Sequence, residues 1–171
     1  MAKLTTHLML LTALAATAAC TTKRQPLPPA PGEQPAPAAP ENTQQPGDGI
    51  VPGSRADFLR SVTSDTVHFA LDQYDLDPES QSILNSQLAW LQRYPNVTVT
   101  IEGHCDERGT REYNLALGDR RANSVKNFLV TRGIAATRIT TISYGKERPI
   151  ALGSDEASWA QNRRAVTVVL N

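Results

Sequence analysis

A proline-rich stretch near the start of the chain limits most strongly where a fold can form. Nine prolines fall between Thr21 and Gly53, at positions 26, 28, 29, 31, 35, 37, 40, 46 and 52, among Ala, Gln and Gly with almost no large apolar side chain. Such a stretch cannot bury enough apolar surface to form a core. Because proline favours extended backbone, we expect residues 20–54 to form a semi-rigid tether, about 100 Å long when taut at roughly 3.1 Å per residue. A ligand for a proline-binding domain is the alternative that we favour less.

The residues before the tether have the pattern of an export signal. Lys3 is followed by the apolar run LMLLTALAA at residues 8–16, which has signal-peptide length and is too short to span a bilayer. Small residues then precede Cys20, and this arrangement resembles the lipobox family of lipoprotein signals, although Thr17 stands where that family usually has Leu. The resemblance implies that residues 1–19 are a signal peptide and that Cys20 is acylated. The alternative is an ordinary secretory signal with a chance cysteine.

The same resemblance implies a location. Thr21, not Asp, follows Cys20, and in such lipoproteins this implies sorting to the outer membrane, with the protein facing the periplasm. Each buried methylene of an acyl chain contributes about 0.8 kcal/mol, so several chains, palmitate among them, would hold the protein firmly to outer-membrane lipid. We therefore expect an anchored chain that does not span the membrane.

Charge and cysteine content exclude several classes of protein. The formal net charge of the chain is zero, and residues 55–171 contain 14 basic and 14 acidic side chains. With no cationic excess and only 5% aromatic residues, the chain lacks the features of a nucleic-acid-binding protein. Two cysteines are too few for a disulfide-stapled scaffold.

Residues 55–171 are long enough for one independent core. Alternation predicts strands over residues 66–71, 97–102, 139–144 and 165–170. Helical patterns predict a helix from Asp77-Pro78 to before Pro95, a long helix from Thr110 to Gly133, and a short polar helix over residues 155–164. Helical crossovers favour parallel neighbours among the first three strands, with the last strand antiparallel. The sequence therefore predicts an α+β two-layer sandwich, with one mixed four-stranded sheet and helices packed on one face.

Glycine and charge concentrate in residues 103–121, GHCDERGTREYNLALGDRR, which follow a predicted strand and enter a helix. This segment resembles the signature of the OmpA-like peptidoglycan-binding domain family, and GHCDERGTREYN with NRRAV at residues 162–166 resembles its peptidoglycan-associated lipoproteins (Pal) in particular. The resemblance covers roughly residues 64–171. It implies the OmpA-like fold and non-covalent binding of the meso-diaminopimelate of the peptidoglycan stem peptide, through Asp106 and Arg121. It also implies the Tol-Pal system, with TolB as partner, in outer-membrane constriction during cell division.

The chemistry of these two residues suits that ligand. The free end of diaminopimelate carries an ammonium and a carboxylate on one carbon, so a selective site needs an anion close to a cation. Asp106 can accept the ammonium, and the planar fork of Arg121 can pair bidentately with the carboxylate. The helix row of Arg121 flanks the apolar stripe, whereas Arg120 is expected to face solvent. A purely structural ion pair between Asp106 and Arg121 is the alternative.

The first strand and the loop after it resemble the other wall of the family's pocket. The resemblance implies further contacts from Phe69, Asp72 and Tyr74, although the alternation makes Phe69 equally a core residue. Asn114 and Leu115 are expected to position the loop.

His104, Cys105 and Asp106 also suggest a catalytic reading, with a thiol beside an imidazole. Adjacent residues of an extended segment point to opposite faces, so we do not expect His104 and Cys105 to pair, and we predict no enzyme activity. No CxxC or HxxxH spacing occurs, so neither a metal nor a cofactor is expected. For Arg163 and Arg164 we favour ion pairs with acidic residues of the sheet edge or of the 103–112 loop over ligand contact. The rival functions are a generic OmpA-like wall anchor outside the Tol system and a lipid-anchored hydrolase.

Overall fold

The computed structural model describes residues 49–170. The predicted signal peptide, Cys20 and all but the last residues of the predicted tether lie outside the described residues. Within residues 49–170, no helix combines the length and the hydropathy needed to cross a bilayer.

Capping residues in the sequence place the helices. The helix α2 (Pro78–Arg93) begins after Asp77, whose side chain accepts a hydrogen bond from the Ser80 N–H, and α3 (Arg111–Thr131) begins after Thr110 in the same way. Both match the prediction, as does the short α4 (Glu156–Asn162), which Asp155 caps. The helix α1 (Arg55–Ser61), capped by Ser54, and the 3₁₀ turn η1 (Ala136–Arg138) were not predicted.

The sheet is mixed and four-stranded, as predicted, with the order β1-β4-β2-β3. Its strands are β1 (Thr66–His68), β2 (Val99–His104), β3 (Ile139–Gly145) and β4 (Arg164–Val169). β2 and β3 are parallel, and β4 is antiparallel to its neighbours β1 and β2. The expectation that the first two strands are neighbours was wrong, because β4 lies between them and forms a ladder with each. The predicted strand over residues 66–71 is also shorter than expected, and Leu71 is half exposed because the chain turns away after His68.

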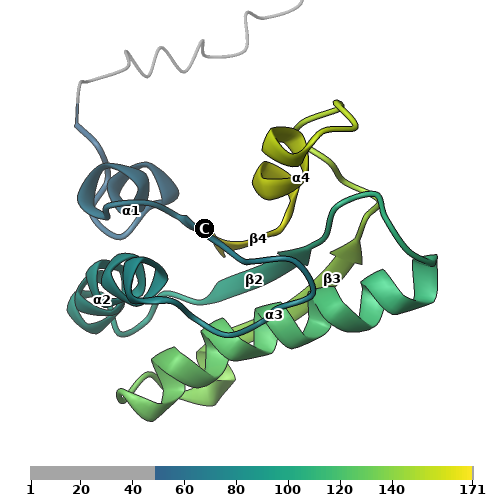
Figure 1. Cartoon of the computed structure of the whole chain (residues 1–171). Coiled ribbons are helices and arrows are strands. Elements are labelled where there is room, and N and C mark those ends of the chain that lie inside the picture. Colours follow the sequence, from purple (N-terminus) through teal and green to yellow (C-terminus); the bar gives the residue numbers. More distant parts are fainter. Residues whose placement is uncertain (1–48, 171) are drawn as a thin grey trace, which may run out of the picture. The chain divides into compact units, whose positions relative to one another are not determined.

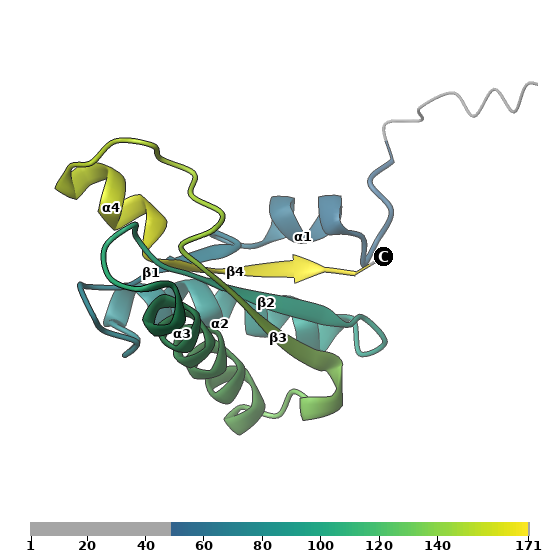
Figure 2. The same ribbon diagram turned by 90° about the vertical axis from the view of Figure 1, so that its right-hand side faces the viewer.

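The helices α2 and α3 cover one face of the sheet, and Leu84, Leu91, Ile101 and Leu129 meet in the core between the layers. The short helices α1 and α4 lie toward the other side of the strands in both views (Figures 1 and 2). α1 closes one end of the core with Phe58, whose ring centroid lies 4.9 Å from that of Trp90 in α2. The predicted two-layer sandwich is therefore confirmed for the two long helices.

Two glycines bring α3 directly onto β2. A Cβ added at Gly103 would lie 1.9 Å from the Gly118 carbonyl oxygen, and one added at Gly118 would lie 2.3 Å from Ser143 Oγ. No side chain other than hydrogen fits at this crossing. The close approach sets the first turns of α3 beside the end of β2, where the residues of the signature segment converge.

Candidate functional site

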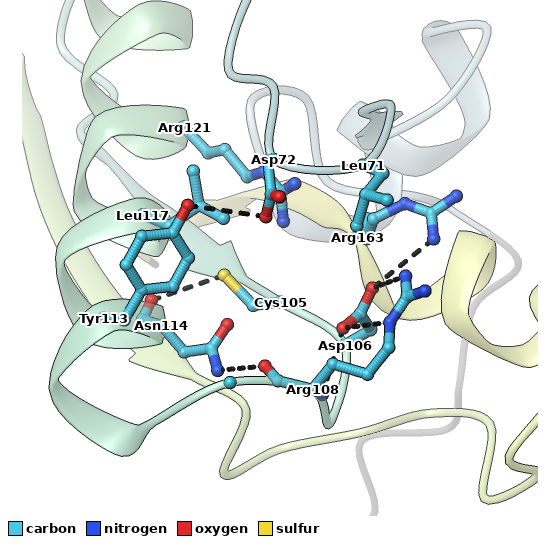
Figure 3. A pocket seen from close by; sticks show the side chains of 11 residues that line it. Leu71, Asp72, Cys105, Asp106, Arg108, Tyr113, Asn114, Leu117, Arg121 and Arg163 are labelled. Carbon is cyan, nitrogen blue, oxygen red and sulfur yellow. Dashed lines mark hydrogen bonds and ion pairs between the residues drawn. The ribbon is translucent and has the colours of Figure 1, made fainter.

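A cavity of about 310 Å³ opens where the end of β2, the start of α3 and the loop after β1 meet. Figure 3 shows its lining side chains gathered from these three segments and from the residue before β4. The lining residues are Leu71, Asp72, Cys105, Asp106, Arg108, Gly109, Tyr113, Asn114, Leu117, Arg121 and Arg163. The cavity therefore combines two carboxylates and three guanidinium groups with the apolar side chains of Leu71 and Leu117.

The loop that carries Asp106 is held from both of its sides. Asn114 in α3 donates from Nδ2 to the carbonyl oxygens of Arg108 and Thr110, at 2.7 and 3.0 Å. Lys146 donates from Nζ to the carbonyls of Glu107 and Gly109, at 3.0 and 2.7 Å. The predicted positioning role of Asn114 is confirmed by these contacts, while that of Leu115 stays a prediction.

Asp106 is buried, with 5% of its surface exposed, and lies among cations. Arg108 donates to its carboxylate from the backbone N–H, from Nε and from Nη2, the last at 2.6 Å, and Arg163 Nη1 lies 3.4 Å from Oδ2. Burial would raise the pKa of Asp106, but the hydrogen bonds and charges of Arg108 and Arg163 outweigh it and lower this pKa below its ordinary value. The carboxylate is therefore charged at neutral pH.

Arg121 is fully buried and is held by backbone carbonyls. Its guanidinium donates from Nε to Gln73 O, from Nη1 to His104 O and from Nη2 to Ala70 O, at 2.9, 2.9 and 3.2 Å. The guanidinium carbon also lies 5.2 Å from the centroid of the Phe69 ring. These contacts tie α3 to the loop after β1 and to the end of β2, and they fix the guanidinium at the cavity wall.

Asp106 and Arg121 line the same cavity, as the zwitterion hypothesis requires. They do not form the structural ion pair that was the alternative, since none of the ion pairs found within residues 49–170 includes Arg121. The carboxylate and the guanidinium are instead held separately, each by its own partners.

The three residues that the family resemblance implies for the other wall of the pocket lie in different places. Asp72 lines the cavity at a backbone φ of 56°, and the Tyr113 hydroxyl donates to its Oδ1 at 3.4 Å. Phe69 belongs to the core and supports Arg121 from beneath without lining the cavity. Tyr74 faces a second, more open hollow that it shares with Gln81, Phe128 and Arg132. The structure therefore places Asp72 at the cavity, and it places Phe69 and Tyr74 away from it.

The arginines before and within β4 were expected to form ion pairs. Arg163 does so with Asp106 and with Glu156, whose Oε1 lies 2.7 Å from Arg163 Nη2, but it also lines the cavity. Arg164 instead donates to the carbonyl oxygens of Asn162 and Arg148.

Sequence reasoning missed Arg108, Tyr113 and Arg163 as lining residues. Arg108 and Tyr113 stand in the recognised signature, and the ion pair of Arg163 with an acidic residue of the 103–112 loop was predicted, but its place in the cavity was not.

The side chains of Cys105 and His104 contact different partners. The Cys105 thiol lines the cavity and donates to Asn114 O at 3.3 Å, and burial raises the pKa of this thiol. The His104 ring lies 5.5 Å from the Tyr144 ring, and neither of its nitrogens has a hydrogen-bond partner. Glu102 Oε2 lies 3.5 Å from Nε2, but burial and the charges of Arg164 and Arg148 lower the pKa of His104 to about 4, so this contact is no ion pair at neutral pH. The thiol is protonated and the imidazole does not face it, which is the wrong arrangement for a nucleophile and its base.

The chain is similar to known proteins in sequence and in structure. Residues 68–163 match the model of the OmpA family. Peptidoglycan-associated lipoproteins of Agrobacterium fabrum and Brucella melitensis are 52% and 53% identical over 118 residues, which is 69% of this chain and 66% and 70% of theirs. The crystal structure of the peptidoglycan-associated lipoprotein from Burkholderia pseudomallei superposes with a TM-score of 0.61 at 44% identity, over 63% of this chain and 91% of that one.

Proposed function

Because the chain belongs to the OmpA family and is similar over most of its length to peptidoglycan-associated lipoproteins, we propose that it is a cell-wall anchor that binds peptidoglycan without covalent chemistry. The ligand is the free amino-acid head of meso-diaminopimelate in the stem peptide. The observation that carries this proposal is the single cavity that holds both signs of charge, with Asp106 and Arg121 on its wall. A zwitterionic head needs such a pair of groups, because an unpaired charge in a desolvated site is expensive.

Arg121 is suited to binding a carboxylate because its guanidinium is held rigidly. Three of its five N–H donors are committed to backbone carbonyls, and the other two are the ones that a carboxylate would use. A donor held in place loses little conformational entropy when a ligand binds. Asp72 is the second carboxylate of the cavity and a further acceptor for the ammonium.

The anchor at the other end of the protein is Cys20, acylated after removal of residues 1–19, with residues 20–54 as the tether. The wall-binding domain would then couple the outer membrane to peptidoglycan from the periplasmic side. This assignment predicts that a Cys20→Ser chain is recovered in the soluble periplasmic fraction. Recovery of that variant with the membranes would contradict the anchor.

We further propose that the protein acts in the Tol-Pal system, with TolB as its partner, during outer-membrane constriction in cell division. A generic wall anchor would bind the same ligand without TolB, so a pull-down with purified TolB separates the two. A lipid-anchored hydrolase would release soluble fragments from purified sacculi, and it would need a nucleophile that the protonated, hydrogen-bonded Cys105 does not provide.

Co-sedimentation with purified sacculi tests the wall-binding function. We expect the full chain in detergent to pellet with sacculi and to be displaced by free meso-diaminopimelate. Asp106→Asn should weaken pelleting, while Asp119→Asn, a matched change at an exposed carboxylate of α3 outside the cavity, should leave it unchanged. Pelleting of Asp106→Asn at the level of the unchanged chain would contradict the proposed site.

A further inference from the structure

The two charged groups that the proposed function uses are not equally available to a ligand. Asp106 has only two oxygens, and they already receive four N–H contacts from Arg108 and Arg163. A carboxylate offers about four acceptor positions, so these contacts saturate it. An incoming ammonium must displace one of these donors. The binding free energy gained from the new contact is therefore reduced by the free energy lost with the displaced donor.

Arg121 is in the opposite condition. It is buried and lines the cavity, its guanidinium donates to three backbone carbonyls, and no acidic side chain of residues 49–170 forms an ion pair with it. Backbone carbonyls satisfy part of its hydrogen bonding but carry no net charge. An arriving carboxylate is therefore the first formal anion that this guanidinium pairs with.

The surrounding charges reinforce this asymmetry. Arg163 Nη1 and Arg108 Nη2 lie at 3.4 and 2.6 Å from Asp106 Oδ2, so the acidic side of the cavity is already covered by cations (Figure 3). The acidic residue that balances Arg163 from outside is Glu156, whose side chain is mostly exposed and is screened by solvent. Across the cavity, the carboxylate of Asp72 is exposed and accepts a hydrogen bond from the Tyr113 hydroxyl at 3.4 Å, so solvent screens its attraction for an ammonium.

From this asymmetry, and resting on the proposed function, we infer that the cavity selects its ligand by the carboxylate, so that amidated diaminopimelate is rejected more strongly than a head without its ammonium. An amide places an NH₂ group against the Arg121 donors and removes the anion. Loss of the ammonium leaves Asp106 with the partners it already has.

A panel of four stem tripeptides tests this inference without changing the protein. Each has the form L-Ala-γ-D-Glu-X, where X is meso-diaminopimelate, its distal amide, L-lysine, which lacks only the distal carboxylate, or 2-aminopimelate, which lacks only the distal ammonium. Binding to the full chain in detergent is measured by isothermal titration calorimetry. We expect the amide and lysine peptides to bind at least about 30-fold more weakly than the parent, and the aminopimelate peptide to lose about 5-fold or less.

The outcomes separate the inference from the proposed function. An aminopimelate peptide that loses as much affinity as the amide, or an amide that binds within about 5-fold of the parent, overturns the inference and leaves diaminopimelate binding intact. A parent peptide that does not bind at all contradicts the proposed function, and the inference with it.

A pair of variants provides a second test of selection by the carboxylate. Arg121→Lys keeps the charge but loses the planar fork, so the preference for the parent over its amide should shrink by about 10-fold. The control is Arg120→Lys, at the exposed neighbouring position, which should keep the preference of the unchanged protein. A preference that survives in Arg121→Lys would place the selection elsewhere.

Discussion

The guanidinium of Arg108 lies over the indole ring of Trp159, 4.0 Å from its centroid. The same indole donates from Nε1 to Glu107 Oε1 at 3.0 Å, so α4 contacts two adjacent residues of the loop that carries Asp106. Trp159 is half-buried beside the cavity, whereas Trp90, the other tryptophan of the chain, is buried against α1. The structure therefore places one natural fluorophore next to the proposed site and one away from it.

This placement predicts an optical signal of binding. In a Trp90→Phe chain, titration with the diaminopimelate tripeptide should change the emission of Trp159, because the ligand competes for the Arg108–Asp106 contact and alters the cation over the ring. In the matched Trp159→Phe chain the tripeptide should leave the emission unchanged. Equal changes in both chains would show that the signal does not come from this loop.

Arg121 should matter for stability as well as for binding. Replacement by Ala leaves the carbonyls of Gln73, His104 and Ala70 without their donors and opens a void in the core, which we expect to cost about 4 kcal/mol of unfolding free energy. Urea denaturation measures the effect, with Arg120→Ala as a surface control expected within about 0.5 kcal/mol of the unchanged chain. Equal stability of the two variants would contradict the structural role.

The crossing of α3 and β2 predicts a steric effect. A methyl group at Gly103 would collide with the backbone of Gly118, which cannot move without shifting α3, so Gly103→Ala should lower the unfolding free energy by about 3 kcal/mol. At Gly49 an added Cβ meets no atom within 4 Å, and Gly49→Ala serves as the control. Thermal unfolding distinguishes them, and an unchanged midpoint for Gly103→Ala would show that the helix does not sit this close to the strand.

His104 should make the fold sensitive to acid. Its pKa is lowered to about 4 by burial and by the charges of Arg164 and Arg148, while Glu102 in its own strand is too weak a counterweight. Because the unfolded chain takes up a proton below about pH 6.5 and the folded one does not, the stability from this site is complete above that pH and falls by about 3 kcal/mol toward pH 4. Denaturation at pH 7 and pH 4 measures the loss.

The matched variant for this acid sensitivity is His104→Phe, which keeps a ring against Tyr144 but does not titrate. Its unfolding free energy should fall by about 3 kcal/mol less than that of the unchanged chain over the same pH interval, with His68 titrating equally in both. An identical pH dependence in the two chains would assign the acid sensitivity to other groups.

Local signals account for the parts of the fold that the sequence predicted well. Asp77 with Pro78, and Thr110 before its helix, are capping signals that act within one turn, so the helix starts follow from neighbouring residues. The position of β4 between β1 and β2 does not follow in this way, because it depends on pairings with two strands that are distant in the sequence. The helix α1 was missed because its buried contribution is essentially one residue, Phe58, which gives no periodic stripe.

In the candidate site too, some residues could be predicted from local sequence and others depend on distant pairings. Asp106 and Arg121 come from one continuous segment, and the signature was enough to name them. Arg163 reaches Asp106 from 57 positions away, and its arrival depends on the register of β4. Tyr74 lies outside the cavity, after a turn at Asp72 with a φ of 56° that no residue pattern before it indicates.

The most direct test of the account follows the backbone amide signals of the isotopically labelled chain by NMR during titration with the diaminopimelate tripeptide. The account predicts that the perturbed amides are those around the cavity, at residues 71–73, 104–114, 121 and 163, and that the hollow lined by Tyr74, Phe128 and Arg132 is unaffected. Perturbations centred on that hollow, or none around Asp106 and Arg121 at saturating ligand, would contradict it.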